Sequence, residues 1–254
     1  FLESRHLLGD IDLYGEFTRS IKILIGRLNP LDLSQRKLQE LFFRHDNAIG
    51  TKSTLEPNIK EGVGCLRDIH TILWISGFLF DVRKIDEFDS LNIFSKSEIN
   101  ELKLAWKYLS TIRSLNHFFN QSKGDILTIE NQLKIAKLLK YKDQKYKLRK
   151  KELGVEKFMK DLFVQITKIS GILNIFYSKL PEELLSATVF QHGNKVKNYK
   201  NKNFKITKGF LDFKKYDLKN LYLNWLPLLS ESLEKNILVH PKVLSLLRKN
   251  YSRI

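Results

Sequence analysis

Hydrophobic residues recur at spacings of three and four along most of the chain, which is the period of an amphipathic helix. Proline and glycine, which interrupt helices, are few and are densest between residues 50 and 64. The pattern therefore predicts a mainly α fold, a helical bundle. The expected helices cover 2–28 (whole or broken), 34–46, 67–82, 95–119, a short segment from 128, 152–179, 217–235 and 241–251.

Local signals mark several of the expected helix ends. Ser95 followed by Glu98 is a capping-box pattern, and Pro241 stands where a first helical turn tolerates proline. Thr128 is expected to start the short helix. This helix carries three apolar residues at helical spacing, namely Leu133, Ala136 and Leu139.

Residues 203–213 show the pattern of a small β-hairpin. Positions 203–207 alternate polar and apolar, Lys208-Gly209 can turn, and 210–213 can pair back. The stretch from 184 to 211 has no acidic residue and holds six lysines between 195 and 208. We interpret its start as a solvated loop; an acidic partner or RNA is the alternative ligand for these lysines.

Composition narrows the class of protein. The 254 residues are 43% hydrophobic and 28% charged, which excludes a collagen-like or fully disordered chain. A single cysteine, Cys65, excludes an internal disulfide framework and indicates a reducing compartment, the cytoplasm. No apolar run is long enough to span a membrane. Both ends look cut, so the chain is expected to be a fragment of a longer protein.

The charge balance has two interpretations. The chain holds 44 Lys+Arg against 28 Asp+Glu, a net charge of +16. Lysine far outnumbers arginine, and asparagine and isoleucine are abundant, which is what an AT-rich coding sequence produces without selection. A nucleic-acid surface is the sharper alternative.

The segment 55–69 differs from the rest of the chain. It packs Lys60, Gly62, Gly64, Arg67 and Asp68 into a short span and then enters an apolar helix. Glycines let backbone N–H groups approach an anion, and a helix N-terminus adds partial positive charge. The segment is therefore a candidate phosphate-facing turn. The alternative is a tight turn without any ligand; a Walker phosphate loop is absent.

Residues 56–71, EPNIKEGVGCLRDIHT, resemble the signature of the bacterial bifunctional uridylyltransferase/uridylyl-removing enzymes of the PII nitrogen-signalling protein. The glutamine synthetase adenylyltransferase family carries a related pattern. Weaker matches to the uridylyltransferase family follow in the right order over the whole chain: LESRHLLGD at 2–10, VEKFMKD at 155–161, the hairpin, and LVHP at 238–241. The chain departs from the family at Val63 and at Cys65, which stands where a second glycine is usual. A positive φ at Cys65 would carry a steric cost.

The resemblance implies a helical bundle associated with a nucleotidyltransferase domain. It implies transfer of UMP from UTP to a tyrosine of PII, with Mg²⁺ held by carboxylates upstream of this chain. No catalytic residue and no metal ligand is then expected within it, and the chain alone is expected to be inactive. Lys60, Arg67 and the backbone of Gly62 and Gly64 would contact nucleotide phosphates or form an active-site wall, and Asp68 would brace Arg67.

The resemblance also divides the chain into three parts. Residues 1–56 would be the helical tail of the nucleotidyltransferase domain, and 57–180 the motif loop with its helical domain. Residues 181–254 would hold the hairpin and the helices that lead toward a hydrolase domain. UTP and PII are the expected partners, and no membrane is expected. A non-enzymatic basic helical module that binds nucleic acid is the alternative function.

Several other residues imitate functional motifs. Asp10-Ile11-Asp12 looks like a metal-binding carboxylate pair but is expected to cap a helix or lie on the surface. Arg44-His45-Asp46 is expected to be an exposed helix end, and His240 to cap a helix. Cys65 lacks a histidine partner for nucleophilic catalysis but invites a thiol-labelling test. Three tryptophans are expected in the core: Trp74, Trp106 and Trp225.

Overall fold

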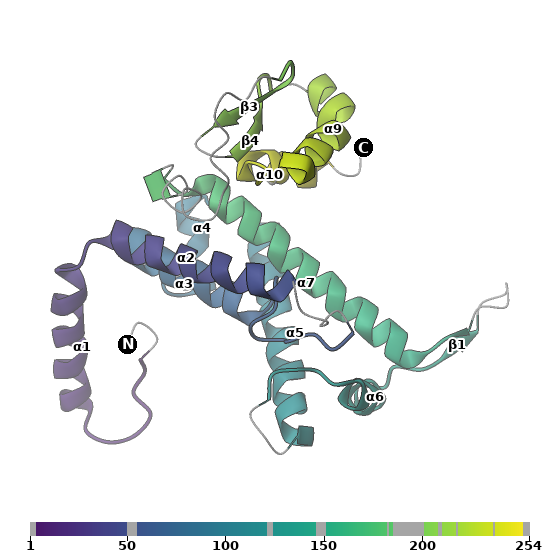
Figure 1. Ribbon diagram of the computed structural model, residues 1–254. Helices are drawn as coiled ribbons and strands as arrows, with labels where there is room; N and C mark the ends of the chain where they lie inside the picture. The colour runs from purple at the N-terminus through teal and green to yellow at the C-terminus, as the bar shows by residue number, and fades with distance from the viewer. Residues whose placement is uncertain are drawn as a thin grey trace.

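The computed structural model describes residues 4–49, 55–120, 124–145, 151–181, 183–184, 201–207, 210–216, 218–235 and 237–250. Helices dominate these described residues (Figure 1), and the strands among them form two short antiparallel pairs. The predicted mainly α fold is confirmed. Among the helices of the described part, none is long and apolar enough to cross a membrane.

The first helix, α1 (Ile11–Gly26), extends away from the rest of the molecule (Figure 1), and none of its residues is buried. It begins at residue 11 rather than 2 because the Asp10 carboxylate accepts hydrogen bonds from the backbone N–H groups of Asp12 and Leu13. The capping interpretation of this acidic pair is thus confirmed. Helix α2 (Pro30–Ile49) follows directly, with proline in its first turn.

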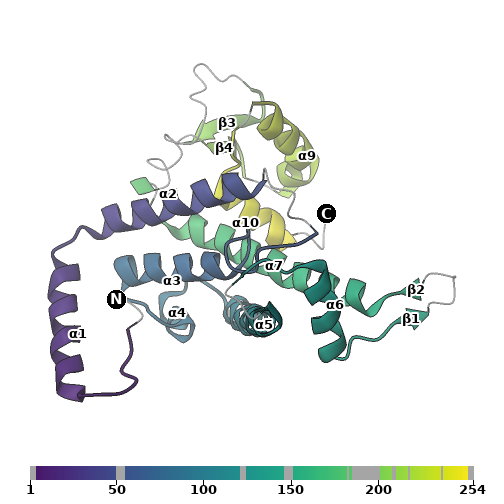
Figure 2. The ribbon, with the colours of Figure 1, turned by 60° about the horizontal axis from the view of Figure 1, so that its bottom comes forward.

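The main body is built from six further helical segments that follow one another between residues 66 and 179. They are α3 (Leu66–Phe80), the short η1 (Ile85–Glu87), α4 (Phe88–Leu91), α5 (Lys96–Asn120), α6 (Ile129–Leu138) and α7 (Gly154–Lys179). Helix α2 packs on α3, and the long α7 packs on α3, α5 and α6 (Figure 2). Their apolar faces enclose one core, which includes Leu41, Ile72, Leu109 and Phe176.

The helix starts follow the local signals. The backbone N–H of Ser95 donates to Glu98 Oε2 at 2.8 Å, and that of Glu98 donates to Ser95 Oγ at 3.3 Å. The predicted capping box is therefore confirmed. Thr128 caps α6 by accepting from the N–H of Asn131, as predicted.

Helix α6 buries polar as well as apolar residues, namely Asn131, Gln132, Ile135 and Ala136. Of the three apolar residues at helical spacing, Ala136 is buried, whereas Leu133 and Leu139 are 55% and 37% exposed. The reason is that Gln132 is buried and donates to the backbone carbonyls of Leu55 and Leu127. These hydrogen bonds orient the helix against the loop.

The C-terminal part forms a second, smaller hydrophobic cluster (Figure 1). Strands β3 (Phe204–Thr207) and β4 (Phe210–Phe213) pair antiparallel, as the hairpin pattern predicts, with Phe204 opposite Phe213. Helices α9 (Leu218–Lys235) and α10 (Pro241–Asn250) complete the cluster, and α10 also packs on α7. The predicted turn at 208–209 and the lysines at 195, 197 and 200 lie outside the described residues.

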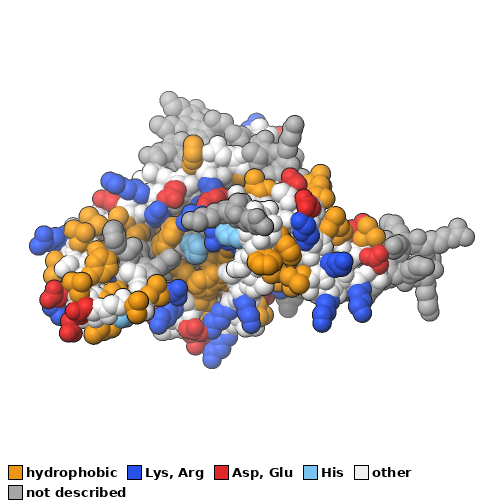
Figure 3. Space-filling model, turned by 90° about the horizontal axis from the view of Figure 1, so that it is seen from below, with side chains coloured by type: hydrophobic (Ala, Val, Ile, Leu, Met, Phe, Trp, Pro, Cys, Tyr) orange, Lys and Arg blue, Asp and Glu red, His pale blue; other side chains and the backbone are white. Residues whose placement is uncertain are grey.

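Two other features complete the architecture. Strands β1 (Gln144–Lys145) and β2 (Lys151–Glu152) form a short ribbon in the lysine-rich region. Helix α2 shares one core with α3 and α7, and the expected domain boundaries at 56 and 180 stay predictions. Seen from below, Lys and Arg side chains are scattered among hydrophobic ones rather than gathered into one continuous patch (Figure 3).

Candidate functional site

The motif loop is held in place by the segment that precedes α6. The N–H of Ile59 donates to the carbonyl of Asp125 at 2.9 Å, and the N–H of Leu127 donates to that of Pro57 at 2.9 Å. Within the loop, the side-chain oxygen of Asn58 accepts from the N–H groups of Lys60 and Glu61. The loop is thus a fixed structure whose backbone groups are largely paired internally.

The two glycines of the loop are required by close packing. A Cβ at Gly62 would lie 2.5 Å from the carbonyl oxygen of Asn58. Gly64 has φ of +74°, and its Cβ would lie 2.4 Å from the carbonyl oxygen of Ile166 in α7. Cys65 has φ of −102°, so the steric cost considered for a cysteine at this position does not arise.

Asp68 is the centre of a buried polar cluster. Its side chain is fully buried, and it forms an ion pair with Arg44. His45 Nε2 lies 3.0 Å from Asp68 Oδ1, and the Gly64 N–H donates to Asp68 Oδ2 at 2.7 Å. We call these four residues the Asp68 cluster. It joins the end of α2 to the start of α3, so the two helices run antiparallel.

The Asp68 cluster corrects two expectations. Arg44 and His45 are only 13% and 17% exposed, so Arg44-His45 is not an exposed helix end, although Asp46 is exposed. Asp68 holds Arg44 and His45, so the expected bracing of Arg67 by Asp68 is also wrong. The physical reason is that α2 packs over the motif and brings Arg44 and His45 to the buried carboxylate.

Arg67 and Lys60 are brought together by another carboxylate, that of Glu61. Arg67 Nη2 donates to Glu61 Oε1 at 2.9 Å, and Lys60 Nζ lies 3.7 Å from the same oxygen. Arg67 also lies over the ring of Trp74, 5.5 Å from its centroid. Burial raises the pKa of Glu61, but the hydrogen bond from Arg67 and the surrounding cations outweigh this, so the pKa lies below its ordinary value.

A second carboxylate, that of Asp125, lies beside Lys60 and was not among the predicted site residues. Asp125 accepts from Arg113 Nε at 2.7 Å and lies 2.8 Å from His117 Nε2, while Lys60 Nζ is 3.7 Å from its Oδ2. Arg113 and His117 are four residues apart on α5 and therefore share one face of the helix. That spacing was the only available signal, and it does not identify Asp125 as their partner.

The Asp125→Asn variant is expected to lose its stability difference from the wild type as the solution is acidified. Burial raises the pKa of Asp125, but hydrogen bonds from Arg113 and His117, with the charges of Arg113 and Lys60, lower it below its ordinary value. A carboxylate with a lowered folded-state pKa stabilises the fold above its unfolded pKa. This contribution is lost as the pH falls through the folded-state pKa.

Urea denaturation at several pH values measures this effect. The difference in unfolding free energy between the wild type and the variant should be largest at neutral pH and should shrink between pH 5 and pH 2, on the order of the window for such carboxylates. A difference that grows on acidification would contradict the prediction.

A pocket of about 520 Å³ opens beside the loop, between it and α2. Its polar lining includes Glu40, Arg44, Glu56, Asn58 and Glu61. Arg44 Nε is buried there without a hydrogen-bond partner among the described residues. Lys60 and Arg67 do not line the pocket, but both pair with Glu61, which does.

The structure limits the chemistry of the Cys65 thiol and of the side chains that could bind a metal ion. Cys65 is 1% exposed, and burial together with the nearby Asp68 charge raises the pKa of its thiol, so the thiol is protected rather than activated. Across the described part of the chain, no three His, Cys, Asp or Glu side chains converge in a way that could hold a metal ion.

The tryptophans differ from their predicted burial. All three, Trp74, Trp106 and Trp225, are partly exposed, and Trp106 packs against the core. Trp74 has the charged groups of Lys37 and Arg67 over its ring, and His70 contacts both Trp74 and Trp106. The two cation–π contacts stabilise the Trp74 ring at the surface of the bundle. His240 caps α10 as predicted, because its Nδ1 accepts from the N–H of Lys242.

Comparisons with known proteins identify what the chain is similar to. A family model described as GlnD PII-uridylyltransferase matches residues 33–177. The bifunctional uridylyltransferase/uridylyl-removing enzyme of Ruegeria pomeroyi is 27% identical over 100% of this chain and 27% of its own length. The enzyme of the same name from Rhodospirillum rubrum is 32% identical over 72% of this chain and 19% of its own length. That from Cereibacter sphaeroides is 28% identical over 98% of the chain and 26% of its own length.

The chain therefore spans about a quarter or less of the length of these relatives. No solved structure matches it.

Proposed function

Because the chain belongs to the GlnD PII-uridylyltransferase family, we propose that it is the helical part of an enzyme that transfers UMP from UTP to a tyrosine of the PII protein and also removes it. The family match over residues 33–177 is the observation that carries this proposal. It covers α2 to α7 and hence the motif loop. The alignment with the Ruegeria pomeroyi relative covers the whole chain.

Within this function, Lys60 and Arg67 contact the phosphates of the nucleotide. Their convergence on Glu61 supports this role, because one carboxylate then holds two cations in a common place. A triphosphate carries more negative charge than one carboxylate and replaces Glu61 as their partner. Arginine can bind a phosphate through two parallel hydrogen bonds, which orient the phosphate as well as neutralise its charge.

Gly62, Gly64 and Asp68 support the loop in this proposal. The Gly64 N–H donates a hydrogen bond to Asp68, so it is already paired in the absence of a phosphate. Gly62 and Gly64 allow the backbone to pass close to Asn58 and to α7. Asp68 anchors the start of α3 to α2 through Arg44. These residues therefore set the position from which Lys60 and Arg67 act.

Mg²⁺ would supply charge neutralisation at the transferred phosphate, as is general in phosphoryl and nucleotidyl transfer. The described residues of this chain do not fit such an ion, because they offer no cluster of three ligands. We therefore assign no step to Mg²⁺ here and propose that its carboxylates lie outside these 254 residues.

The 254-residue chain by itself is expected to show no transfer of UMP. The reason is that the proposed division leaves the metal-binding carboxylates on another part of the protein. Incubation of the purified chain with PII, Mg²⁺ and UTP labelled at the α-phosphorus measures this directly. Label in PII above the level of a heat-treated sample would show that the chain holds its own catalytic centre.

In the longer protein that the proposal implies, Lys60→Ala and Arg67→Ala are each expected to raise the KM for UTP about tenfold or more. A charge-assisted hydrogen bond contributes roughly 1.5–3 kcal/mol, and about 1.4 kcal/mol corresponds to a factor of ten. Steady-state transfer of labelled UMP to PII at varied UTP concentration measures the change.

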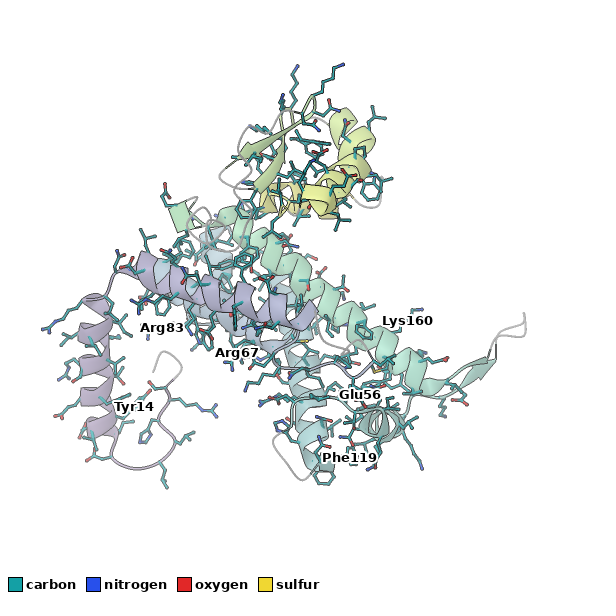
Figure 4. All side chains as sticks on the ribbon, viewed as in Figure 1. Tyr14, Glu56, Arg67, Arg83, Phe119 and Lys160 are labelled. Atoms are coloured by element: carbon teal, nitrogen blue, oxygen red, sulfur yellow. The ribbon has the colours of Figure 1, made fainter. Side chains whose placement is uncertain are left out.

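Lys160→Ala provides the matched control for these variants. Lys160 is exposed on α7, on the opposite side of α5 from Arg67 in the view of Figure 4. It should leave the KM for UTP unchanged. If Lys60→Ala and Arg67→Ala also leave it unchanged while PII is still modified, the phosphate role of the loop is wrong and the family membership stands without it.

A further inference from the structure

A second pocket, of about 550 Å³, lies between α5 and the segment that follows α3. It lies outside the motif loop. None of its lining residues lines the first pocket, which opens beside that loop. Its charged and aromatic lining consists of Arg83, Lys84, Asp86, Lys103, Trp106 and Lys107. Four cations thus face one carboxylate in a space of the size that small-molecule sites occupy.

The positive charge of this pocket is only partly compensated. Lys103 forms an ion pair with Asp86, and Arg83 Nη2 lies 3.4 Å from Asp81, whose side chain is 86% exposed. In the described part of the chain, Lys84 and Lys107 form no ion pair. A ligand with several negative charges can therefore bind here without displacing an existing partner from either lysine.

Trp106 adds an aromatic side chain to the lining of the same pocket. The indole is partly exposed, and the His70 ring contacts it edge-on at 6.3 Å between centroids. This contact ties Trp106 to α3, while the indole also lines the pocket on α5. An aromatic face beside a group of cations is the combination that binds a nucleobase together with its phosphates.

The pocket is also separated from the motif loop. Arg67 lies in the first turn of α3, and Arg83 follows the end of that helix; both are labelled in Figure 4. Fifteen residues of helix span about 22 Å at 1.5 Å per residue, so the Arg83–Lys84 end of the pocket lies far from Arg67, whereas Trp106 contacts His70, which is one turn from Arg67. The lysines of this pocket are therefore a set distinct from Lys60 and Arg67.

We propose that this pocket binds a nucleoside di- or triphosphate, with its base against Trp106 and its phosphates among Lys84, Lys103 and Lys107. The size of the pocket favours a single nucleotide over an acidic peptide, which would need a longer groove. The charge excess favours a polyphosphate over a monovalent anion. This assignment does not depend on the function proposed for the motif loop.

Calorimetric titration of the 254-residue chain with ATP tests the proposal, at low salt and with EDTA so that no divalent cation neutralises the phosphates. Saturable binding is expected. The double variant Lys84→Ala/Lys107→Ala should weaken it about tenfold or more, because each lost charge-assisted contact is worth a factor of this order. Both lysines are exposed, so the variant is expected to fold, which circular dichroism verifies.

The matched control is Lys157→Ala/Lys160→Ala on α7, which removes the same charge at a distance from the pocket. It should change the affinity for ATP by no more than about twofold, the order expected for screened long-range charge. Equal weakening by the two double variants would mean that the net charge of the chain, rather than the pocket, attracts the anion, and would overturn the proposal.

Tripolyphosphate tests the role of the base. It has the phosphates of ATP without an aromatic ring, so it should bind at least about fivefold more weakly, since stacking of one base contributes at least this factor. Equal affinity for tripolyphosphate and ATP would refute the stacking on Trp106 and with it the nucleotide assignment. Absence of saturable ATP binding would refute the site altogether.

Discussion

The Asp68→Asn variant is expected to lose about 3–5 kcal/mol of unfolding free energy, the usual cost of removing one partner from a buried ion pair. Asp68 is fully buried and is the charge partner of Arg44, whose side chain is only 13% exposed. Asparagine keeps the shape of the side chain but removes its charge, so the buried Arg44 guanidinium keeps, among the ion pairs of the described residues, only the longer contact of its Nε with Glu61 Oε2, at 3.9 Å. The amide also presents a donor where the carboxylate accepted from His45 and Gly64.

Chemical denaturation followed by circular dichroism measures this loss, with Asp81→Asn as the matched control. Asp81 pairs with Arg83, but its side chain is 86% exposed, so its ion pair should contribute only about 0–1 kcal/mol. Asparagine also suits the left-handed backbone at this position, where φ is 53°. If the two variants have the same stability, Asp68 does not anchor α2 to α3 as the geometry indicates.

The Gly64→Ala variant is expected to lose about 2–5 kcal/mol, which combines the cost of a left-handed backbone with that of overpacking. The φ of Gly64 is +74°, and a Cβ would lie 2.4 Å from both the Ile166 carbonyl oxygen and Ser170 Oγ. The Ser170 hydroxyl can rotate away, but the carbonyl belongs to the backbone of α7 and cannot. The loop must therefore move away from α7.

Gly77→Ala is the control for this substitution. Gly77 lies within α3, and a Cβ there would make only an ordinary contact of 3.5 Å with the Val82 carbonyl oxygen. Alanine in place of glycine inside a helix is worth up to about 1 kcal/mol of added stability. Denaturation midpoints of the two variants should thus shift in opposite directions. A stable Gly64→Ala protein would mean that the loop tolerates a different path.

The roles of Gly64 and Asp68 explain why the motif loop is rich in glycine and polar residues. Gly64 and Asp68 serve the packing of the loop against α7 and α2, and Asn58 closes the turn that precedes Gly62. The proposed contacts with a ligand are therefore concentrated in Lys60 and Arg67. Loss of Asp68 or Gly64 would affect nucleotide binding indirectly, through displacement of the loop.

The helices themselves were largely predictable from the chain. Predicted segments 95–119 and 152–179 correspond to α5 and α7, which run from 96 to 120 and from 154 to 179. The periodicity of both helices and the capping box of α5 are short-range features, because a helix depends on residues three and four positions apart. The hairpin strands were predictable for the same reason, since alternation has a period of two. The motif segment, with Lys60 and Arg67, was also visible as an unusual cluster.

Only the three-dimensional packing decides which groups the charged side chains pair with. Asp68 binds Arg44 and His45, more than twenty positions earlier, because α2 lies antiparallel over α3 and shields the Asp68–Arg44 ion pair from water. Lys60 meets Asp125 because the segment before α6 pairs with the loop. The strength of such pairs depends on burial and distance, which are properties of the assembled helices and leave no periodic trace in the order of the residues.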